Sequence, residues 1–461
     1  MDKRKFAAEK PYSKPHNRKV SPARLSAFEI LLKIEKESAF SSVLLPLYEE
    51  KLEVKDRALC HELTLGVLRN QIYLDWAAQK FSKSKIEKFD SEVLTALRLG
   101  IYQMLFLDKV PVFAAINESV NLVYLSKKSS AGGMVNAVLR KIEREKPLQI
   151  EAKDEIEKLS IETSHPSWLV EHWAENFGLE ETKKLAAANN VAPGTVFRLT
   201  GKSDEKTVET LRKFGLELVN SKIVSNAWRI SKPNEMFRVF ADEGRIYFQD
   251  ESSQLVGQII NLKKSESFLD VCAAPGSKTT YISAFQASDR ESVDNKSNIF
   301  AGGDKHFHRL RVLRENCRRV GAENVSIAAY DAEYALPFKE ETFDCVLVDA
   351  PCSGTGTIRH NPEIKYFLKP EDLIELPLKQ LVILENASKV LKIGGRLIYS
   401  TCSLECSENE GVIEKFISGN ADFKISSNGI PDRFLTSEGF ARTFPQRDDT
   451  DGFFIAMLEK S

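Results

Sequence analysis

The second half of the chain alternates between short apolar runs and helical segments, and this alternation constrains its fold more than any other feature. Five apolar runs each lead into a polar or glycine-containing turn: SFLDV, SNIFAGGD, NVSIAAYD, TFDCVLVD and RLIYSTC. Helical patterns separate the runs, and one of them, LPLKQLVILENASKVLKIGG, is expected to end at its glycine pair. Apolar strands joined by helices are typical of a mostly parallel sheet covered on both faces. Residues 246–461 are therefore predicted to form a doubly wound α/β domain, in which ligands bind at the carboxyl ends of the strands.

Two further domains are predicted before this sheet. Residues 22–145 show helical periodicity throughout, and the segment DSEVLTALRLGIYQMLFL has Asp90 or Ser91 placed to cap its helix. Residues 146–245 mix two signals, because TVFRLT and AWRIS look like strands and the helical segment between them ends at Gly215. The chain is therefore predicted to be multidomain, with an all-helical bundle, a small α+β module and then the α/β domain.

Charge and cysteine content narrow the class of protein. Residues 1–24 carry eight Lys or Arg against two acids, so residues 1–21 are expected to be a disordered basic arm. Such an arm could contact phosphates or be a solvated tail, and both readings stay open. Seven irregularly spaced cysteines argue against a disulfide framework. No segment has the pattern of a membrane helix or a secretory signal, so we expect a cytoplasmic protein without a membrane partner.

Three successive strand ends carry residues suited to an adenosine. In LDVCAAPGSKTT a strand passes into a turn whose Ala273, Ala274 and Gly276 let a ligand approach the backbone. The turn matches neither the dinucleotide loop nor the Walker loop. The next strands end in Asp304 and Asp331, where carboxylates could accept ribose hydroxyls and meet an adenine amino group. Any one of these acids could instead cap a helix, but together they favour an adenosine-containing cofactor, with S-adenosylmethionine the leading candidate.

Two cysteines follow neighbouring strand ends. Cys352 stands in VDAPCSG and Cys402 in IYSTCSL, and in a sheet of order 3-2-1-4-5 their strands, the fourth and fifth, are adjacent. Both sulfurs should then face one pocket beside the cofactor's methyl group. A zinc site that includes Cys406 is a rival, but its C-x₃-C spacing is unusual and no fourth ligand is evident, so no metal is predicted. A redox pair is a second rival, although the C-x-x-C motif is absent.

A methyltransferase with a thiol in this position must need a covalent handle on its substrate. Carbon 5 of cytosine is such a case, because a thiolate that adds to carbon 6 makes carbon 5 nucleophilic. An acid at ring N3 would ease the addition, and Asp349 fits that role. Methylation of an amino group needs no thiol. The residues therefore favour methylation at carbon 5.

Several stretches resemble known families. DVCAAPGSKT, DAPCSGTG, YSTCSLECSENE and DGFFIAML resemble the signatures of RNA cytosine-C5 methyltransferases, and ALRLGIYQM, AINESVNL and MVNAVLRKI resemble the NusB-type RNA-binding fold. Together they resemble the bacterial Sun/RsmB branch, which modifies small-subunit ribosomal RNA, and the similarity covers residues 22–458. It implies a NusB-like bundle, a Rossmann-like class I methyltransferase domain, S-adenosylmethionine as cofactor and ribosomal RNA as partner.

The resemblance also implies roles for individual residues. Cys402 maps to the nucleophile, and Cys352 maps to the thiol that assists product release. Lys278 is expected to hydrogen-bond the site or the base, with an ordinary surface lysine as the alternative. Ser277 stands where the commonest motif has a glycine, which looks tolerable near the cofactor's methionine part. The implied cofactor contacts are Cys272, Ala273, Ala274, Pro275, Gly276, Ser277, Lys278, Asp304, Arg309, Asp331 and Asp349.

Two basic segments are predicted to contact the substrate. One is the face of a helix that carries Arg311, Arg314 and Arg318, and the other follows the Pro-Cys turn with Arg359, His360, Lys365, Tyr366 and Lys369. We therefore predict a monomeric, S-adenosylmethionine-dependent methyltransferase that acts on carbon 5 of a cytosine in 16S ribosomal RNA. The alternatives are a transfer RNA cytosine-C5 methyltransferase and a non-catalytic RNA-binding or ribosome assembly factor.

Overall fold

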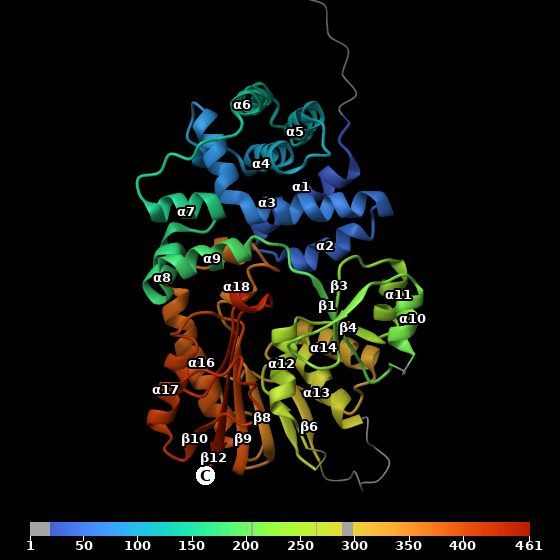
Figure 1. Ribbon diagram of the computed structural model, residues 1–461, viewed down its shortest axis with the longest axis vertical. Helices are drawn as coiled ribbons and strands as arrows, with labels where there is room; N and C mark the ends of the chain where they lie inside the picture. Colours follow the sequence, from blue (N-terminus) through green and yellow to red (C-terminus); the bar gives the residue numbers. More distant parts are fainter. Residues whose placement is uncertain (1–18, 204–205, 264, 288–297) are drawn as a thin grey trace, which may run out of the picture. The chain divides into compact units, whose positions relative to one another are not determined.

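The computed structural model describes residues 19–203, 206–263, 265–287 and 298–461, and divides into two compact units, residues 1–171 and 172–461 (Figure 1). Apart from its last three residues, the predicted basic arm lies outside the described residues. Each unit has its own set of elements, apart from one helix that spans the boundary. No helix in the described part of the chain is long and apolar enough to span a bilayer.

The first unit is helical, as the periodicity predicted. Its helix α4 is buried along almost its whole length and contacts α1, α3, α5 and α6. Asp90 is the N-cap residue of α4, as predicted, although its side chain makes no cap hydrogen bond and its carboxylate lies 3.0 Å from Lys128 Nζ. The elements of the unit are α1 (Pro22–Glu37), α2 (Ser41–Glu49), α3 (Val54–Phe81), η1 (Ile86–Lys88), α4 (Ser91–Phe106), α5 (Val112–Leu125), η2 (Ser129–Ala131), α6 (Gly132–Glu145) and α7 (Glu155–Thr163).

The second unit begins within α8 (Ser167–Phe177) and contains the predicted α+β module. Four antiparallel strands form its sheet in the order β2-β3-β1-β4, and Gly215 follows the helix α10 with a left-handed φ of 80°. Phe197 of β1 and Phe237 of α11 pack at its core. The elements are α9 (Leu179–Asn189), β1 (Thr195–Leu199), α10 (Thr207–Lys213), β2 (Leu218–Asn220), β3 (Ala227–Ile230), α11 (Glu235–Asp242) and β4 (Ile246–Phe248).

The rest of the second unit is a doubly wound domain around an eight-stranded sheet. The sheet order is β10-β12-β9-β8-β5-β6-β7, with β11 on β12, and the pairs from β7 through β9 are parallel. The predicted order 3-2-1-4-5 is thus confirmed for β7, β6, β5, β8 and β9. The strands are β5 (Phe268–Asp270), β6 (Phe300–Asp304), β7 (Ser326–Ala329), β8 (Phe343–Asp349), β9 (Leu391–Thr401), β10 (Phe423–Ser426), β11 (Ala441–Thr443) and β12 (Phe453–Lys460).

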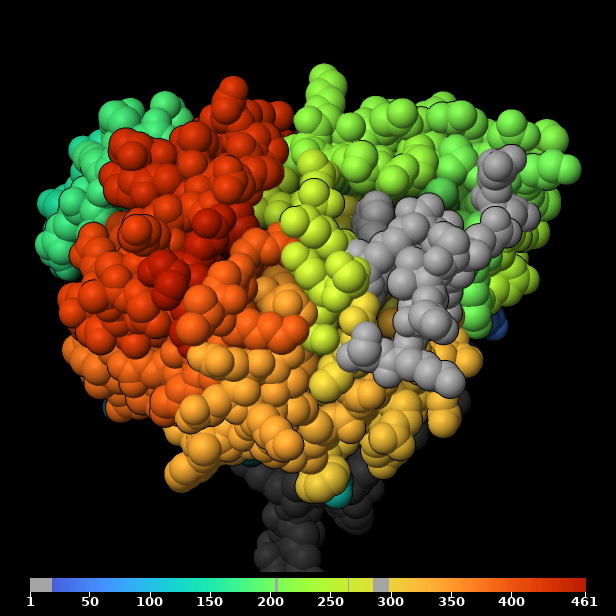
Figure 2. Space-filling model, turned by 90° about the horizontal axis from the view of Figure 1, so that it is seen from below, coloured from blue at the N-terminus to red at the C-terminus, as the bar shows by residue number. Residues whose placement is uncertain are grey.

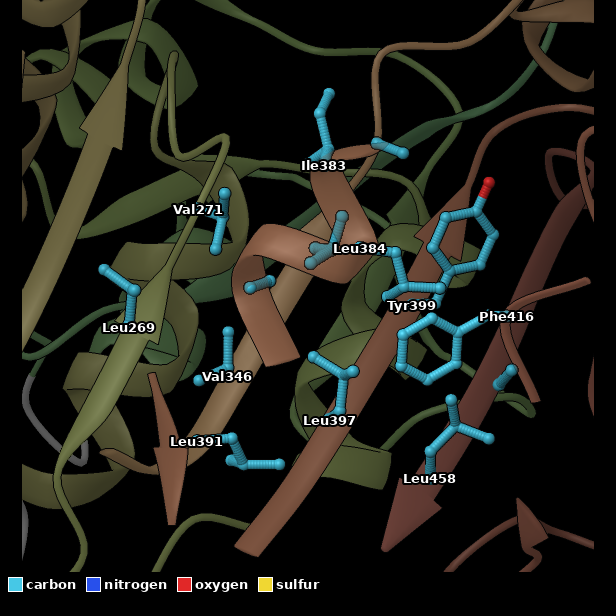
Figure 3. Packing of buried hydrophobic residues seen from close by; sticks show 14 of the residues in the cluster. Leu269, Val271, Val346, Ile383, Leu384, Leu391, Leu397, Tyr399, Phe416 and Leu458 are labelled. Carbon is cyan, nitrogen blue, oxygen red and sulfur yellow. The ribbon is translucent and has the colours of Figure 1, made fainter. Parts of the chain in front are cut away.

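Helices cover both faces of this sheet. Side chains of β8 alternate between the faces: Val346 and Val348 pack in the cluster that includes α16 and α17, whereas Cys345 and Leu347 pack toward α12 and α13. Figure 3 shows the first cluster, with Leu384 of α16 over the strand residues. The helices are α12 (Glu251–Ile260), α13 (Ser277–Ala287), α14 (Phe307–Val320), η3 (Thr355–Thr357), α15 (Ile364–Phe367), α16 (Asp372–Lys389), α17 (Glu410–Gly419) and α18 (Pro445–Asp448).

One predicted helix end is wrong. The helix α16 ends at Lys389, and the glycine pair that was expected to stop it lies inside β9. Leu391 pairs with Phe343 and Arg396 with Cys345, so β9 bulges between these two pairs, and Gly394 has a φ of 76° in the bulge. Glycine serves here as a bulge residue, because only a residue without Cβ adopts this conformation freely.

The module and the doubly wound domain lie side by side in the second unit. In Figure 2 the light-green module occupies one side of the face in view, and the red C-terminal segments occupy the other. Tyr247 of β4 packs in one cluster with Leu310 and Leu313 of α14, so side chains of the two parts share a core.

Candidate active site

The structure brings the two predicted thiols together. The strands β8 and β9 pair in parallel so that Asp349 lies opposite Ser400, and a cysteine follows each strand end. The Sγ atoms of Cys352 and Cys402 are 3.4 Å apart, close enough for an S–H···S hydrogen bond. Both side chains are partly exposed, so a substrate atom could reach them.

An ion pair between a buried lysine and a partly exposed carboxylate lies beside the thiols. The Lys278 Nζ atom donates to Asp349 Oδ2 at 2.7 Å, and Ser400 Oγ donates to Asp349 Oδ1 at 2.8 Å. Burial by itself lowers the pKa of Lys278, but the attraction of Asp349 outweighs it and raises that pKa above its ordinary value. Lys278 is only 6% exposed and faces the ring of Phe453, so it is no ordinary surface lysine.

Glu408 holds the turn that carries Cys352, and the sequence reasoning missed it. Its carboxylate accepts hydrogen bonds from the Ser353 N–H at 2.9 Å and from Ser353 Oγ at 2.7 Å. The Gln380 amide donates to the Pro351 carbonyl at 3.0 Å, and the Tyr399 hydroxyl donates to the Glu408 carbonyl at 2.6 Å. In Figure 3 the Tyr399 ring lies in the apolar cluster while its hydroxyl points away from it. Glu408 is fully buried, and burial raises its pKa.

Further polar contacts fix the loop after Cys402. The buried carboxylate of Glu405 accepts from Trp173 Nε1 at 3.1 Å and pairs with His172 Nε2 at 2.8 Å. The hydrogen bond that the Glu405 carboxylate accepts from the His172 ring raises the pKa of His172. Thr401 donates to the side chain of Asn409 at 2.5 Å. The acids in the segment LECSENE carry no periodic signal, so only the folded chain shows which way they face.

The turn after β5 is built for close approach. Gly276 has a φ of 105°, and a Cβ at this position would lie 2.6 Å from Leu313 Cδ1, so no other residue fits without a shift. The turn contains the predicted contacts Cys272, Ala273, Ala274 and Pro275, and Ser277 begins α13. Burial raises the pKa of the Cys272 thiol, which therefore stays protonated.

The predicted strand-end acids occupy the expected edge of the sheet. Asp304 is the last residue of β6, and its Oδ2 atom is 3.0 Å from Arg309 Nη1, while Arg309 Nη2 donates to the Ala274 carbonyl at 2.5 Å. Arg309 thus ties the turn after β5 to the end of β6. Asp331 follows β7 and pairs with Lys305 at 2.8 Å, which lowers the Asp331 pKa. Asp304 and Asp331 also each accept one backbone N–H two residues on, so both bond the local backbone as well.

This edge suits an adenosine-containing cofactor. The close-approach glycine, the buried carboxylate of Asp304 and the second acid on the next strand supply backbone access and hydroxyl or amine acceptors in the order predicted. Asp304 uses one oxygen for Arg309 and one for a backbone N–H, and each carboxylate oxygen has a second lone pair for a hydroxyl. The chemistry of the donor set therefore fits the group.

A buried arginine of the module reaches this edge and was not predicted. Arg198 of β1 donates to Gln249 at 2.7 Å, to Thr280 Oγ1 at 2.8 Å and to the Ser277 carbonyl at 3.2 Å. Its guanidinium also lies over the ring of Tyr247. Burial lowers its pKa to about 10, so it stays charged at neutral pH. The module thereby fixes the first turn of α13.

The two predicted substrate surfaces fare differently. Arg311, Arg314 and Arg318 are exposed on α14. By contrast, Arg359 and Lys365 are buried, which corrects their assignment to an exposed phosphate surface. Arg359 pairs with Asp449 at 3.3 Å and Lys365 donates to Asn190 at 3.3 Å. Both side chains therefore make contacts within the folded chain.

Metal-ligating groups gather at one place among the described residues. Asp250, His360 and Asp451 have potential ligand atoms within 4.8 Å of one another, and His360 Nδ1 lies 2.9 Å from Asp451. The rival thiol set does not form such a cluster in the described chain, and Cys406 instead contacts the Arg442 guanidinium at 3.8 Å.

Comparison with known proteins decides the family. Residues 257–459 match the model described as 16S rRNA methyltransferase RsmB/F, residues 21–144 match the NusB family, and residues 165–236 match the RsmF/B-like ferredoxin-like domain. The "Probable ribosomal RNA small subunit methyltransferase B" of Bacillus subtilis (strain 168) is 34% identical over 453 residues, which is 96% of this chain and 99% of the relative. The chain belongs to the RsmB/F family of 16S rRNA methyltransferases.

A second relative and two solved structures are also similar to this chain, over different shares of its length. The "Ribosomal RNA small subunit methyltransferase B" of Pseudomonas syringae pv. tomato is 32% identical, with 95% of this chain and 96% of the relative covered. The crystal structure of PH0851 has a TM-score of 0.82 and 26% identity, and covers 96% of this chain and 99% of its own. The methyltransferase homologue from Pyrococcus horikoshii has a TM-score of 0.57 and 25% identity over 67% of this chain and 100% of its own. The predicted order of NusB-like, α+β and methyltransferase domains is thus confirmed for this RsmB/F protein, while the limits of each domain stay a prediction.

Proposed function

We propose that this chain transfers a methyl group from S-adenosylmethionine to carbon 5 of a cytosine in 16S ribosomal RNA, through a covalent bond between Cys402 and carbon 6. The observation that carries the proposal is the 3.4 Å separation of two thiols at adjacent strand ends, beside the Lys278–Asp349 pair. Membership of the RsmB/F family supports ribosomal RNA as the substrate and S-adenosylmethionine as the cofactor.

Cys402 acts by forming a bond to the cytosine ring and later leaving it. Its thiolate forms a bond to carbon 6, and the displaced electron pair makes carbon 5 nucleophilic. The bound cofactor supplies an electrophilic methyl group for carbon 5. Loss of the carbon 5 proton then returns its electron pair to the ring, breaks the bond to Cys402 and restores aromaticity. In this scheme Cys352 assists the release step, as in the related cytosine-C5 enzymes.

The Lys278–Asp349 pair supplies polarity next to the ring. The Lys278 ammonium uses one of its three N–H donors on Asp349, so the others can face the ring nitrogen N3 as negative charge builds there. Asp349, which the sequence placed at N3, accepts from Lys278 and Ser400, so in this scheme it holds the ammonium in place and Lys278 takes the contact with N3. The cofactor would be held by the turn 272–278, by Asp304 at the ribose and by Asp331 near the adenine, with Arg309 bracing the turn against Asp304.

Bisulfite sequencing tests this proposal against its two alternatives. Purified protein and S-adenosylmethionine are incubated with unmodified 16S ribosomal RNA and, separately, with transfer RNA. We expect one protected cytosine in 16S ribosomal RNA that is absent with Cys402→Ala. Protection confined to transfer RNA would identify a transfer RNA enzyme. RNA binding without any protected cytosine would identify a non-catalytic factor. Either result would refute the proposal, which also places the protein in the cytoplasm with its substrate.

A further inference from the structure

The two neighbouring thiols, Cys352 and Cys402, are chemically identical, so the surrounding groups must decide which sulfur keeps its proton. Cys352 and Cys402 are 3.4 Å apart, and a hydrogen bond between them needs one S–H donor and one sulfur acceptor. A nucleophile must be a thiolate, so catalysis requires that the two thiols differ. The difference must come from the groups that surround each sulfur.

Negative charge gathers on the side of Cys352. The hydrogen bond with Cys402 raises the Cys352 pKa most, burial comes next, and the charges of Cys402 and Glu408 add to it. Glu408 accepts from both the N–H and the hydroxyl of the neighbouring Ser353, so its carboxylate is fixed on this side of the pocket. The Tyr399 hydroxyl of β9 donates to the Glu408 carbonyl, and burial, with smaller effects of Cys352 and Glu408, raises the Tyr399 pKa. From α16, the Gln380 side chain at this turn is a neutral amide. A hydrogen bond from the Gly354 N–H opposes these effects.

The Lys278–Asp349 ion pair lies on the side of Cys402, because Asp349 also accepts from Ser400 of the same strand end. The Lys278 ammonium of α13 interacts with the Cys402 sulfur, and this attraction is one of the causes that raise the Lys278 pKa, after Asp349. A cation stabilises a thiolate and an anion destabilises one. Among the described residues, Glu408 accepts from the neutral groups of Ser353 and Gln380, whereas the carboxylate of Asp349 is paired with the Lys278 cation.

We propose that Glu408 is a positioning residue that keeps the proton on Cys352, so that the Cys352 S–H donates to the sulfur of Cys402. Glu408 thereby assigns the two cysteines their different roles. The meaning of this assignment for catalysis rests on the proposed function, but the difference between the thiols is a property of the protein alone. All groups that carry it belong to the second unit.

The first test uses the unaltered protein without RNA. Brief exposure to iodoacetamide is followed by mass spectrometry, which reports initial alkylation rates at each cysteine between pH 6 and pH 10. At neutral pH we expect Cys402 to react at least about tenfold faster than Cys352, because Cys352 keeps its proton and a protonated thiol is not the nucleophile. Equal rates at the two sulfurs, or faster alkylation of Cys352, would overturn the proposal.

The second test isolates the charge of Glu408. In a Cys402→Ala background only Cys352 remains of the pair, and Glu408→Gln removes the charge while an amide oxygen can still accept from Ser353. The pH midpoint for Cys352 alkylation should fall by about one unit, with tenfold faster reaction below it. Glu405→Gln is the matched control, because it neutralises an equally buried acid of the same loop that faces His172 and Trp173. That control should leave the midpoint in place.

The outcomes separate this inference from the proposed function. An unchanged Cys352 midpoint after Glu408→Gln, in a variant whose circular dichroism matches that of the parent, would refute the role of Glu408 even if cytosine methylation is observed. If Glu408→Gln fails to fold, the rates in the unaltered protein still decide the matter. Conversely, a clear difference between the thiols without any methylation would preserve this inference and refute the proposed function.

Discussion

Asp270 shows how burial changes the chemistry of a single residue. It lies at the end of β5, is 1% exposed and accepts a hydrogen bond from Thr279 Oγ1 at 2.6 Å. Burial raises its pKa to about 7, with Asp349 adding to the effect, even though the Thr279 bond lowers it. The folded protein therefore binds this proton more tightly than the unfolded chain. Its contribution to stability is present at low pH and is lost as pH rises from about 4 to about 7.

Asp270→Asn removes this pH dependence because an amide does not titrate. Its oxygen can still accept the hydrogen bond from Thr279 Oγ1. We expect the thermal midpoint of the variant, relative to the unaltered protein, to rise between pH 5 and pH 8. The free-energy change is roughly 1.4 kcal/mol for each unit of pKa shift. Differential scanning calorimetry measures it, with the exposed Asp432→Asn as control. A difference in midpoint that stays constant across this range would contradict the assignment.

Variants of the Lys278–Asp349 pair distinguish its contribution to stability from its contribution to catalysis. Lys278→Met leaves a partly buried carboxylate without its cation and should cost about 1–2 kcal/mol, less than a fully buried pair because Asp349 is 28% exposed. Lys278→Met/Asp349→Asn should recover most of the stability in urea unfolding. Methylation should stay at least about 100-fold below that of the unaltered protein in both variants. Recovery of activity in the double variant would show that the pair is only structural.

At the scale of single residues, the sequence predicted positions better than environments. Cys352, Cys402 and Asp349 were placed together because strand ends in a parallel sheet meet at one edge. The burial of Arg359 was missed because a basic residue after a loop has the same pattern whether it faces solvent or Asp449. Glu408 was missed for a related reason, since its partner Ser353 lies 55 residues away in the chain.

At the scale of elements, periodicity identified the strands, but it could not locate an irregularity within one. The end of α16 was misplaced because a glycine pair stops a helix and bulges a strand equally well, and the choice depends on pairing with β8. The bulge itself can be tested. Gly394 has a φ of 76° and no atom near the position of a Cβ, so Gly394→Ala isolates the backbone strain.

We expect Gly394→Ala to lower the free energy of unfolding by about 1–2 kcal/mol, which is the cost of a left-handed conformation for a residue with a Cβ. Gly419→Ala is its matched control in the same unit, because Gly419 ends α17 with ordinary backbone angles and equally open space. Its thermal midpoint should stay the same or rise. Equal losses in the two variants would contradict the strained bulge.

At the scale of the whole molecule, the NusB-like unit is the part most readily separated from the chemistry. Helix α7 packs on α3, and the Ser164 hydroxyl accepts from the Tyr73 N–H, so α7 belongs to the first unit. The helix α8 must be kept, because His172 and Trp173 hold Glu405 in the loop after Cys402. The structure therefore favours a cut just after Ser164, before α8 begins.

A chain that begins at His165 should keep its affinity for S-adenosylmethionine, measured by calorimetry, because the turn 272–278, Asp304 and Arg198 all lie in the second unit. Its affinity for 16S ribosomal RNA should fall, and the dependence of binding on salt should become shallower as phosphate contacts are lost. Equal RNA affinity with and without the first unit would refute a recognition role for the NusB-like domain.

The covalent adduct on a denaturing gel tests the central claim most directly. Labelled 16S ribosomal RNA is incubated with S-adenosylmethionine and the Cys352→Ala variant, in which attack is intact and release is impaired. We predict a protein–RNA band that survives denaturation and disappears in the variant that lacks both thiols. A band that forms only when Cys402 is removed would reverse the two roles. The absence of any adduct in Cys352→Ala, despite bound RNA, would contradict the account.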